Sequence, residues 1–299
     1  MSHLLIVLSS PIALLSSNCY SFITFLKYYN CIMEFEFSLL ILNLISCEAG
    51  LRIIAGRDAL NNEFPYAVRL EVKIVKNISD SNSIMYIRFC SGAAVSAKWI
   101  LTAAHCYIDN MELVARYNSY FPNDMGKISP ILKVYIHPQY DEKRFHLKQN
   151  DVALCLSQNL LVSQYGKISA VDYKILVGHK VSILGFGVTN ATKSEKPLQV
   201  LDGMMNNCLE IEKTYRLYMA TMMCVVPVCG VKAKVCPGDS GGPVVHSSGI
   251  VGVNTLTSGH CDEFATDIHF FPGTSAVVVS MISHELDWIS NVISNKVVV

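Results

Sequence analysis

The residues with the clearest chemical potential surround Ser240, in the segment Cys236-Pro-Gly-Asp-Ser-Gly-Gly-Pro243. Three glycines around one serine allow the backbone to turn tightly and to bring N–H groups close to a bound ligand. A serine hydroxyl is a poor nucleophile until a base takes its proton, so a partner histidine is expected elsewhere in the chain.

Two further segments supply the partners that Ser240 needs. Leu101-Thr-Ala-Ala-His-Cys106 contains His105, and Asn150-Asp-Val-Ala-Leu154 contains Asp151, a carboxylate at the start of an apolar stretch. Such a carboxylate fixes the tautomer of the histidine and stabilises its charged form. Each motif alone could be structural, as a hairpin turn, a core histidine or a strand cap, so the prediction of nucleophilic catalysis depends on all three together.

Short apolar stretches broken by turn residues follow Ile53 and predict a mostly-β protein. Residues 68–74 alternate between apolar and charged side chains, which is the period-two pattern of a half-buried strand. Segments 181–187 and 249–253 are predicted strands beside glycine turns. Near the C-terminus, apolar residues at helical spacing predict a helix over about 281–294. These residues are Ile282, Leu286, Ile289 and Ile293.

The three motifs, in this order and at these separations, resemble those of the trypsin/chymotrypsin-like serine endopeptidases, and the resemblance covers residues 53–294. It implies an all-β fold of two antiparallel six-stranded β-barrels with a C-terminal α-helix, and an active site in the cleft between the barrels. The first barrel is expected over about 53–165 and the second over about 166–280. No internal repeat or linker divides residues 53–299, which are expected to form one protease domain.

The resemblance implies that Ser240 attacks the carbonyl of the scissile peptide bond and forms an acyl-enzyme. His105 would act as general base and later as general acid, while Asp151 holds the His105 ring. The backbone N–H groups of Gly238 and Ser240 would form the oxyanion hole, in which one donor typically lowers the barrier by about 3 to 4 kcal/mol. The competing function is that of a non-catalytic serine protease homologue, which keeps the cleft and acts as a binding or regulatory protein.

The segment Arg52-Ile-Ile-Ala-Gly56 resembles the activation site of the same family, at which a trypsin-like protease cuts after the basic residue. The freed amino group of Ile53 is then expected to fold inward and pair with Asp239, and this buried ion pair would place the N–H of Gly238. The uncut chain is therefore predicted to be a zymogen. The structural alternative is that Arg52 is an exposed loop arginine.

The residue six positions before the nucleophile lies at the base of the primary specificity pocket in this family, and here it is Lys234. A lysine would repel a basic substrate side chain, strongly so in a partly desolvated slot, and cleavage after Arg or Lys is therefore not expected. Lys234 either reaches inward and favours an acidic or small residue, or bends to solvent and leaves a shallow neutral pocket. The resemblance also places Thr255, Thr257 and Gly273 at the pocket. The Thr255 hydroxyl is expected to support Asp151, and Thr257 is expected to narrow the entrance.

Eight of the eleven cysteines follow Ile53, and eight cysteines allow 105 pairings, so the sequence alone does not choose one. The resemblance implies three disulfides, which are Cys90–Cys106, Cys208–Cys224 and Cys236–Cys261. Cys155 is expected to be a buried free thiol. Cys229 is an additional cysteine, either free or differently paired, and His246 stands where many relatives have a cysteine.

Residues 1–49 form a leader region with two apolar runs, Leu4–Leu15 and Phe37–Ile45. Neither run reaches the roughly 18 to 20 residues that a membrane span needs. The second run fits the core of a signal peptide, and small residues before the expected cleavage point favour cleavage after Ala49.

We expect Met33 to be the true start, which makes residues 1–32 an untranslated upstream extension or a gene-model error and leaves residues 50–52 as a short activation peptide. The alternatives are one long, unusual signal peptide or a signal anchor that keeps the protein on a membrane. Secretion is the common expectation, and the number of cysteines also favours it.

The chain carries 24 Lys and Arg residues and 24 Asp and Glu residues, and its net charge at pH 7 is zero. This balance argues against nucleic acid or an anionic membrane surface as the main partner.

His284-Glu285 lacks a second histidine one helical turn on, and neither a metal nor a cofactor is expected. Sequons at Asn77 and Asn190 predict glycosylation of a secreted chain. The resemblance implies a monomer whose partners are a protein or peptide substrate, an activating trypsin-like protease and protein protease inhibitors.

Overall fold

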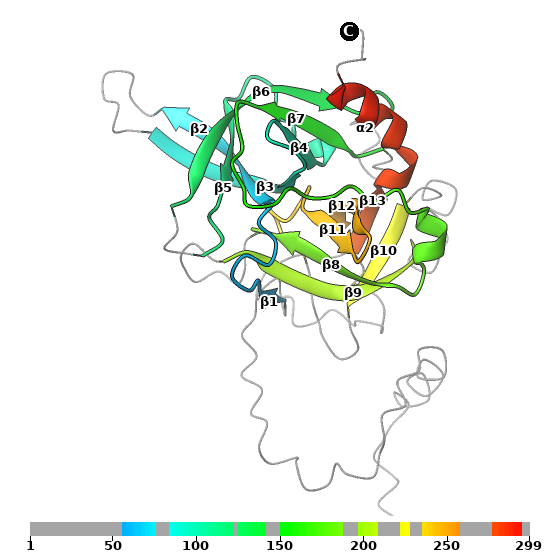
Figure 1. The fold of residues 1–299 in the computed structure, drawn as a ribbon. Coiled ribbons are helices and arrows are strands. Elements are labelled where there is room, and N and C mark those ends of the chain that lie inside the picture. Colours follow the sequence, from blue (N-terminus) through cyan, green and yellow to red (C-terminus); the bar gives the residue numbers. More distant parts are fainter. Residues whose placement is uncertain are drawn as a thin grey trace, which may run out of the picture. The chain divides into compact units, whose positions relative to one another are not determined.

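The structure, a computed structural model, describes residues 56–75, 84–121, 125–141, 150–187, 197–208, 222–227, 235–257 and 277–294. These residues belong to one compact unit, Gly50–Val299. Most of its regular elements are antiparallel strands, which form two closed six-stranded barrels that follow one another along the chain (Figure 1). No helix in the described ranges is both long enough and apolar enough to cross a membrane.

The first barrel contains six strands in the order β2-β3-β4-β7-β6-β5. Buried apolar side chains such as Leu70, Ile100 and Leu154 fill its interior. Burial of such side chains is the main favourable term in folding. The strands are β2 (Ala67–Val75), β3 (Ile84–Ala94), β4 (Trp99–Thr102), β5 (Leu113–Tyr117), β6 (Lys127–Ile136) and β7 (Ala153–Ser157).

The second barrel follows the order β9-β10-β13-β12-β11-β8, and pairing of β8 with β9 closes it. Its core is rich in valine and methionine, for example Met205, Val225 and Val279. A short strand, β1 (Arg57–Asp58), pairs with β9 from outside the barrel. The strands of the barrel are β8 (Lys180–Gly185), β9 (Gln199–Asn207), β10 (Met222–Pro227), β11 (Pro243–His246), β12 (Gly249–Thr257) and β13 (Val277–Met281).

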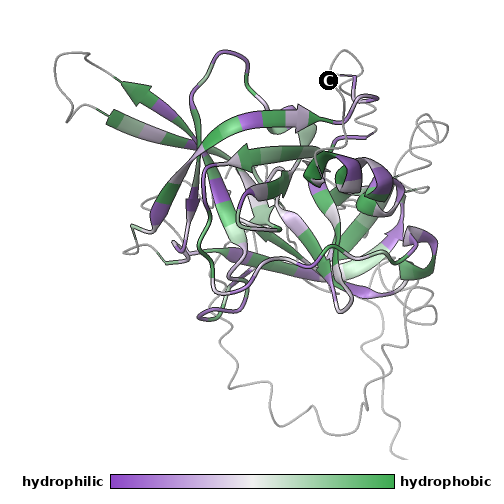
Figure 2. Ribbon diagram, turned by 45° about the horizontal axis from the view of Figure 1, so that its top comes forward, coloured by the Kyte–Doolittle hydropathy of each residue, from purple (hydrophilic) through white to green (hydrophobic). Residues whose placement is uncertain are grey.

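One apolar cluster continues from the first barrel into the second. It joins Leu101 and Leu154 of the first barrel to Leu184 and Val253 of the second. Figure 2 shows hydrophobic residues along most strands of both barrels. The two barrels therefore share part of their core, and the segments at their junction are held between them.

The predicted C-terminal helix is present but shorter than expected. Ile282 lies in a 3-10 turn (Ile282–His284), and the α-helix α2 begins at Leu286 and ends at Ile293. Glu285, directly before α2, is buried and pairs through Oε2 with Nε2 of His137, at 2.7 Å. His137 directly follows β6, so this contact fixes the start of α2 to the first barrel (Figure 1).

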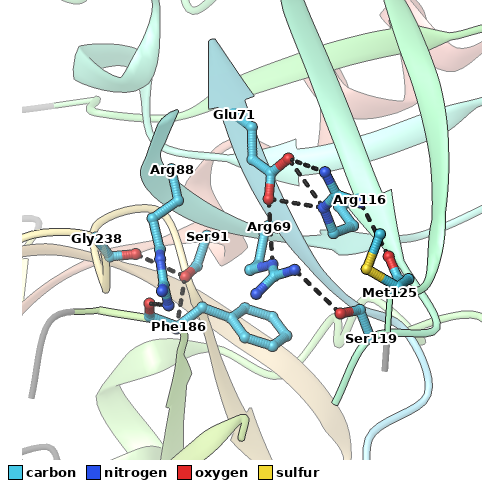
Figure 3. Close-up of polar contacts among 9 residues, drawn as sticks. All are labelled: Arg69, Glu71, Arg88, Ser91, Arg116, Ser119, Met125, Phe186 and Gly238. Carbon is cyan, nitrogen blue, oxygen red and sulfur yellow. Dashed lines mark hydrogen bonds and ion pairs between the residues drawn. The ribbon is translucent and has the colours of Figure 1, made fainter. Parts of the chain in front are cut away.

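The prediction of a half-buried strand over residues 68–74 is wrong for its first half. Arg69 and Glu71 of β2 were expected on a solvated face, yet each side chain is only about 5% exposed. The reason is a buried ion group. Glu71 accepts from Arg116 Nη2 at 2.9 Å and lies 3.3 Å from Arg69 Nε, while Arg69 Nη2 donates to Ser119 Oγ at 3.0 Å (Figure 3). Buried charges are tolerated in proteins when they are paired and hydrogen-bonded in this way.

We predict that Glu71→Gln lowers the free energy of unfolding by about 3 to 5 kcal/mol, because it leaves the buried guanidinium of Arg69 and the partly buried guanidinium of Arg116 without their counter-charge. Urea denaturation of the purified protein measures this loss. The matched control is Glu112→Gln, which removes an exposed carboxylate that pairs with Lys73 at 2.7 Å. The control variant should have a free energy of unfolding close to that of wild type. A Glu71→Gln protein as stable as this control would contradict the prediction.

Candidate active site

His105 and Asp151 come from the ends of two neighbouring strands. The 3-10 turn Ala104–Cys106 follows β4 and carries His105, while Asp151 lies just before β7. Because Thr102 of β4 pairs with Ala153 of β7, the two side chains meet at one rim of the first barrel.

The carboxylate of Asp151 is fully buried, and both of its oxygens bind the same residue. Oδ2 lies 2.7 Å from Nδ1 of His105, and Oδ1 accepts from the backbone N–H of His105 at 2.8 Å. This double contact fixes both the position and the rotation of the imidazole ring. With Nδ1 engaged by the carboxylate, Nε2 is the ring nitrogen that remains for an external proton.

Ser240 lies in a tight turn that connects Cys236 to β11. Gly238 and Gly241 have φ angles of +99° and +76°, in the left-handed region that favours glycine. The carbonyl of Ser240 accepts from the backbone N–H of Ser91 in β3, at 2.8 Å. A Cβ atom at Gly241 would collide with Oγ1 of Thr102, at the end of β4. The Ser240 turn therefore packs directly against the segment that leads into His105.

The side chain of Asp239 points away from solvent and is 1% exposed. Its Oδ1 accepts from the N–H of Gly187 at 2.7 Å and its Oδ2 from the N–H of Cys236 at 2.8 Å. Burial raises the pKa of this carboxyl from 3.8 to about 6, although the two N–H groups favour the charged form. A Cβ atom at Gly185 or Gly187 would collide with the carboxylate, so these two glycines provide the space that it fills.

The specificity-pocket residues are only partly described. Thr255 is buried, and its Oγ1 lies 2.8 Å from Oγ of Ser280 and 3.5 Å from the carbonyl of Val253. The expected support of Asp151 by Thr255 is therefore absent from the described contacts, in which His105 takes both carboxylate oxygens. Thr257 is the last residue of β12. Lys234 and Gly273, like Arg52 and Ile53 of the activation site, lie outside the described residues.

The disulfides agree with the resemblance where they are described. Cys90–Cys106 ties β3 to the His105 turn, and Cys208–Cys224 joins the ends of β9 and β10. Cys236 is disulfide-bonded, while its expected partner Cys261 lies outside the described residues, as does Cys229. Cys155 is a buried free thiol, as expected, and burial raises its pKa to about 12, which makes it chemically inert.

Two further groups of side chains contain histidine. His246 of β11 contacts His179, which directly precedes β8, with Nε2 of His246 3.2 Å from Nδ1 of His179. In the described part of the chain, Cys90, His105 and Cys106 are the one group of three potential metal ligands that lie close together. Because the two cysteines are joined to each other, this group lacks the thiolates that a zinc site requires.

Sequence reasoning missed one residue at the site. The hydroxyl of Ser91 donates to the carbonyl of Gly238 at 2.7 Å and accepts from the N–H of Phe186 at 3.0 Å. A single serine next to a cysteine gives no signal of such contacts, because both partners are more than 90 positions away in the chain.

The pKa of Asp239 generates a prediction for the chain kept uncut at Arg52. The folded-state pKa lies above the unfolded value, so the native state holds its proton more tightly, and stability should fall as the pH rises from 3.8 to about 6. The loss should approach about 3 kcal/mol, at 1.36 kcal/mol per pKa unit. Asp239→Asn removes this titration, and urea unfolding of both proteins at several pH values measures the difference. Parallel pH profiles for wild type and variant would contradict the assigned burial.

The fold agrees with comparisons to known proteins. The model of the Trypsin family matches residues 53–275. Granzyme M of Rattus norvegicus is 32% identical over 81% of this chain and 89% of its own length, and Serine protease 1 of Homo sapiens is 29% identical over 68% and 77%. Among solved structures, HL collagenase has the same fold, with a TM-score of 0.62 and 20% identity over 82% of this chain and 99% of its own. This chain belongs to the Trypsin family, the trypsin-like serine proteases.

Proposed function

We propose that this protein is a secreted serine endopeptidase that hydrolyses peptide bonds through an acyl-enzyme. The observation that carries the proposal is the buried Asp151 carboxylate, which holds His105 by two hydrogen bonds beside the turn that bears Ser240. Membership of a serine protease family supports the same assignment. Two disulfides, Cys90–Cys106 and Cys208–Cys224, support an oxidising and therefore extracellular location.

In the proposed mechanism, Ser240 Oγ attacks the scissile carbonyl as Nε2 of His105 takes the hydroxyl proton. The imidazolium that forms is stabilised by Asp151, whose charge is enclosed and therefore acts at low effective dielectric. The N–H groups of Gly238 and Ser240 would bind the oxyanion. His105 then gives its proton to the leaving amine, and water repeats the sequence to release the acyl group.

The chemistry requires the N–H of Gly238 to point at the oxyanion. We propose that cleavage after Arg52 controls the orientation of this N–H. The new amino group of Ile53 would pair with Asp239. The raised pKa of the Asp239 carboxyl supports this step, because a buried carboxylate that ionises at a cost gains strongly from a nearby cation. A trypsin-like protease would be the activating partner.

The proposed substrates are proteins or peptides with an acidic, small or neutral residue before the cleaved bond. The argument rests on Lys234, six positions before Ser240, whose positive charge would oppose a basic substrate side chain.

Reaction with a fluorophosphonate probe tests the proposed nucleophile. After activation by trypsin, wild type should be labelled, while Ser240→Ala should not be labelled and His105→Ala should react very slowly. Both variants should lose several orders of magnitude in kcat, because the members of such a triad act as one unit. Ser247→Ala, a change at an exposed serine seven positions away, is the matched control and should behave as wild type. Absence of labelling in wild type after verified cleavage at Arg52 would favour the non-catalytic homologue instead.

Arg52→Gln tests the activation step. The variant should resist trypsin at this position and remain inactive with Ser240 intact, because Ile53 then lacks a free amino group. Arg57→Gln, at the exposed arginine of β1, should activate normally. Turnover by Arg52→Gln protein that N-terminal sequencing shows to be uncut would end the activation proposal.

A further inference from the structure

Ser91 is the point at which four backbone segments of the site meet. It lies in β3, is 1% exposed, and uses all of its polar groups. Its N–H donates to the carbonyl of Ser240 at 2.8 Å, and its carbonyl accepts from Oγ1 of Thr102 at 2.8 Å. Its hydroxyl lies between the carbonyl of Gly238 and the N–H of Phe186 (Figure 3). One buried residue of the first barrel therefore contacts the nucleophile turn at two positions.

The direction of both hydroxyl bonds is fixed by chemistry. A backbone N–H can only donate and a carbonyl can only accept, so the proton of Ser91 Oγ must point to Gly238, at 2.7 Å, while a lone pair receives the N–H of Phe186, at 3.0 Å. A hydroxyl held by two bonds of opposite sense has no freedom to rotate. It therefore acts as a rigid spacer between these two peptide groups.

Gly238 is the residue that most needs such a support. It has no side chain, its φ of +99° lies in the left-handed region that glycine adopts readily, and the nearest neighbour of an added Cβ atom would be the backbone of Gly187. A hydrogen bond to its carbonyl holds the peptide group that follows Gly238. The N–H of Gly238 belongs to the preceding peptide group, and only the φ and ψ rotations of Gly238 separate the two. Holding one peptide group therefore limits the orientations open to the N–H of the other. A missing or misdirected oxyanion donor typically costs a factor of 100 to 1,000 in kcat.

We propose that the Ser91 side chain is a positioning residue for the oxyanion hole, holding Gly238 so that its N–H faces the developing oxyanion. This inference rests on the function proposed above. The effect of Ser91 on the orientation of the Gly238 N–H is separate from that of Asp239. Ser91 bonds to the carbonyl of Gly238, whereas Asp239 would act by pairing its carboxylate with the amino group of Ile53.

The other end of the spacer is itself firmly placed. The Phe186 carbonyl accepts from Nη1 of Arg88 at 3.4 Å, and the guanidinium of Arg69 lies over the Phe186 ring, 5.7 Å from its centre. Figure 3 shows the ring of Phe186 next to the guanidinium of Arg69, and a contact from Phe186 to Ser91. Two arginines of the first barrel thus hold Phe186, and Ser91 bonds both to Phe186 and to Gly238. The position of Gly238 therefore depends on that of Phe186.

Ser91→Ala in the trypsin-activated enzyme tests the proposal. The change removes the hydroxyl while keeping the Cβ, and should lower kcat by about tenfold or more with little change in KM, since only transition-state binding is affected. Concentrations of active enzyme are set by end-point titration with the fluorophosphonate, so partial unfolding does not enter the comparison.

A pair of inhibitors separates positioning from general damage. A peptide aldehyde forms a tetrahedral adduct whose oxyanion occupies the hole, whereas the corresponding peptide alcohol binds without one. Ser91→Ala should weaken the aldehyde by the same factor as kcat and leave the alcohol within about twofold. Thr102→Val, which removes another buried hydroxyl bond to the same residue, should not discriminate between the two inhibitors.

The outcomes distinguish this inference from the proposed function. Equal weakening of both inhibitors by Ser91→Ala, or an unchanged kcat, would overturn the role of Ser91 while leaving the endopeptidase assignment intact. A wild-type protein that neither reacts with the fluorophosphonate nor binds the aldehyde more tightly than the alcohol would overturn both.

Discussion

The burial of the Asp239 carboxylate directly beside Ser240 is the constraint on which the rest of the site depends. Its oxygens are held by the N–H groups of Gly187 and Cys236, which lie on different segments. Enclosure makes the charge costly, as the pKa of about 6 shows, and a Cβ atom at Gly185 or Gly187 would occupy the space that the carboxylate fills. A carboxylate under this constraint responds strongly to any cation that reaches it. Gly238 and Ser240, its neighbours in the turn, are expected to shift when the carboxylate moves toward such a cation.

The nucleophile turn belongs to the second barrel in sequence, but its backbone is tied to the first. Ser91 of β3 bonds the carbonyls of Ser240 and Gly238, and the disulfide Cys90–Cys106 joins the same strand to the His105 turn. His105 and Ser240 are thereby positioned relative to one strand. The shared apolar cluster holds the barrels together around this strand, so neither barrel alone carries the complete arrangement.

Local patterns predicted a mostly-β protein and named His105, Asp151 and Ser240, of which His105 and Asp151 are in direct contact. The family resemblance predicted the two barrels and the described disulfides. Sequence reasoning failed where the outcome depends on partners far apart in the chain. Arg69 and Glu71 have the pattern of a solvated face, yet they are buried because Arg116 and Ser119 lie opposite them. The hydrogen bond between Thr255 and Ser280, in place of one to Asp151, and the contacts of Ser91 likewise follow from strand packing that no short motif encodes.

The buried ion group around Glu71 gains its significance from what it touches. Buried ion pairs commonly contribute little net stability, because desolvation offsets their attraction. Here the Arg69 guanidinium that Glu71 pairs with also covers the ring of Phe186, whose N–H meets Ser91 and whose neighbour Gly187 binds Asp239. The charges thus orient the ring of a short segment that bonds directly to Asp239, through the N–H of Gly187, and reaches Gly238 only through the Ser91 hydroxyl. A hydrophobic replacement of similar volume would preserve the packing of this region but would lose the guanidinium over the ring. The significance of the ion group is therefore the link that it makes between β2 and the Ser240 turn, and not a gain in stability.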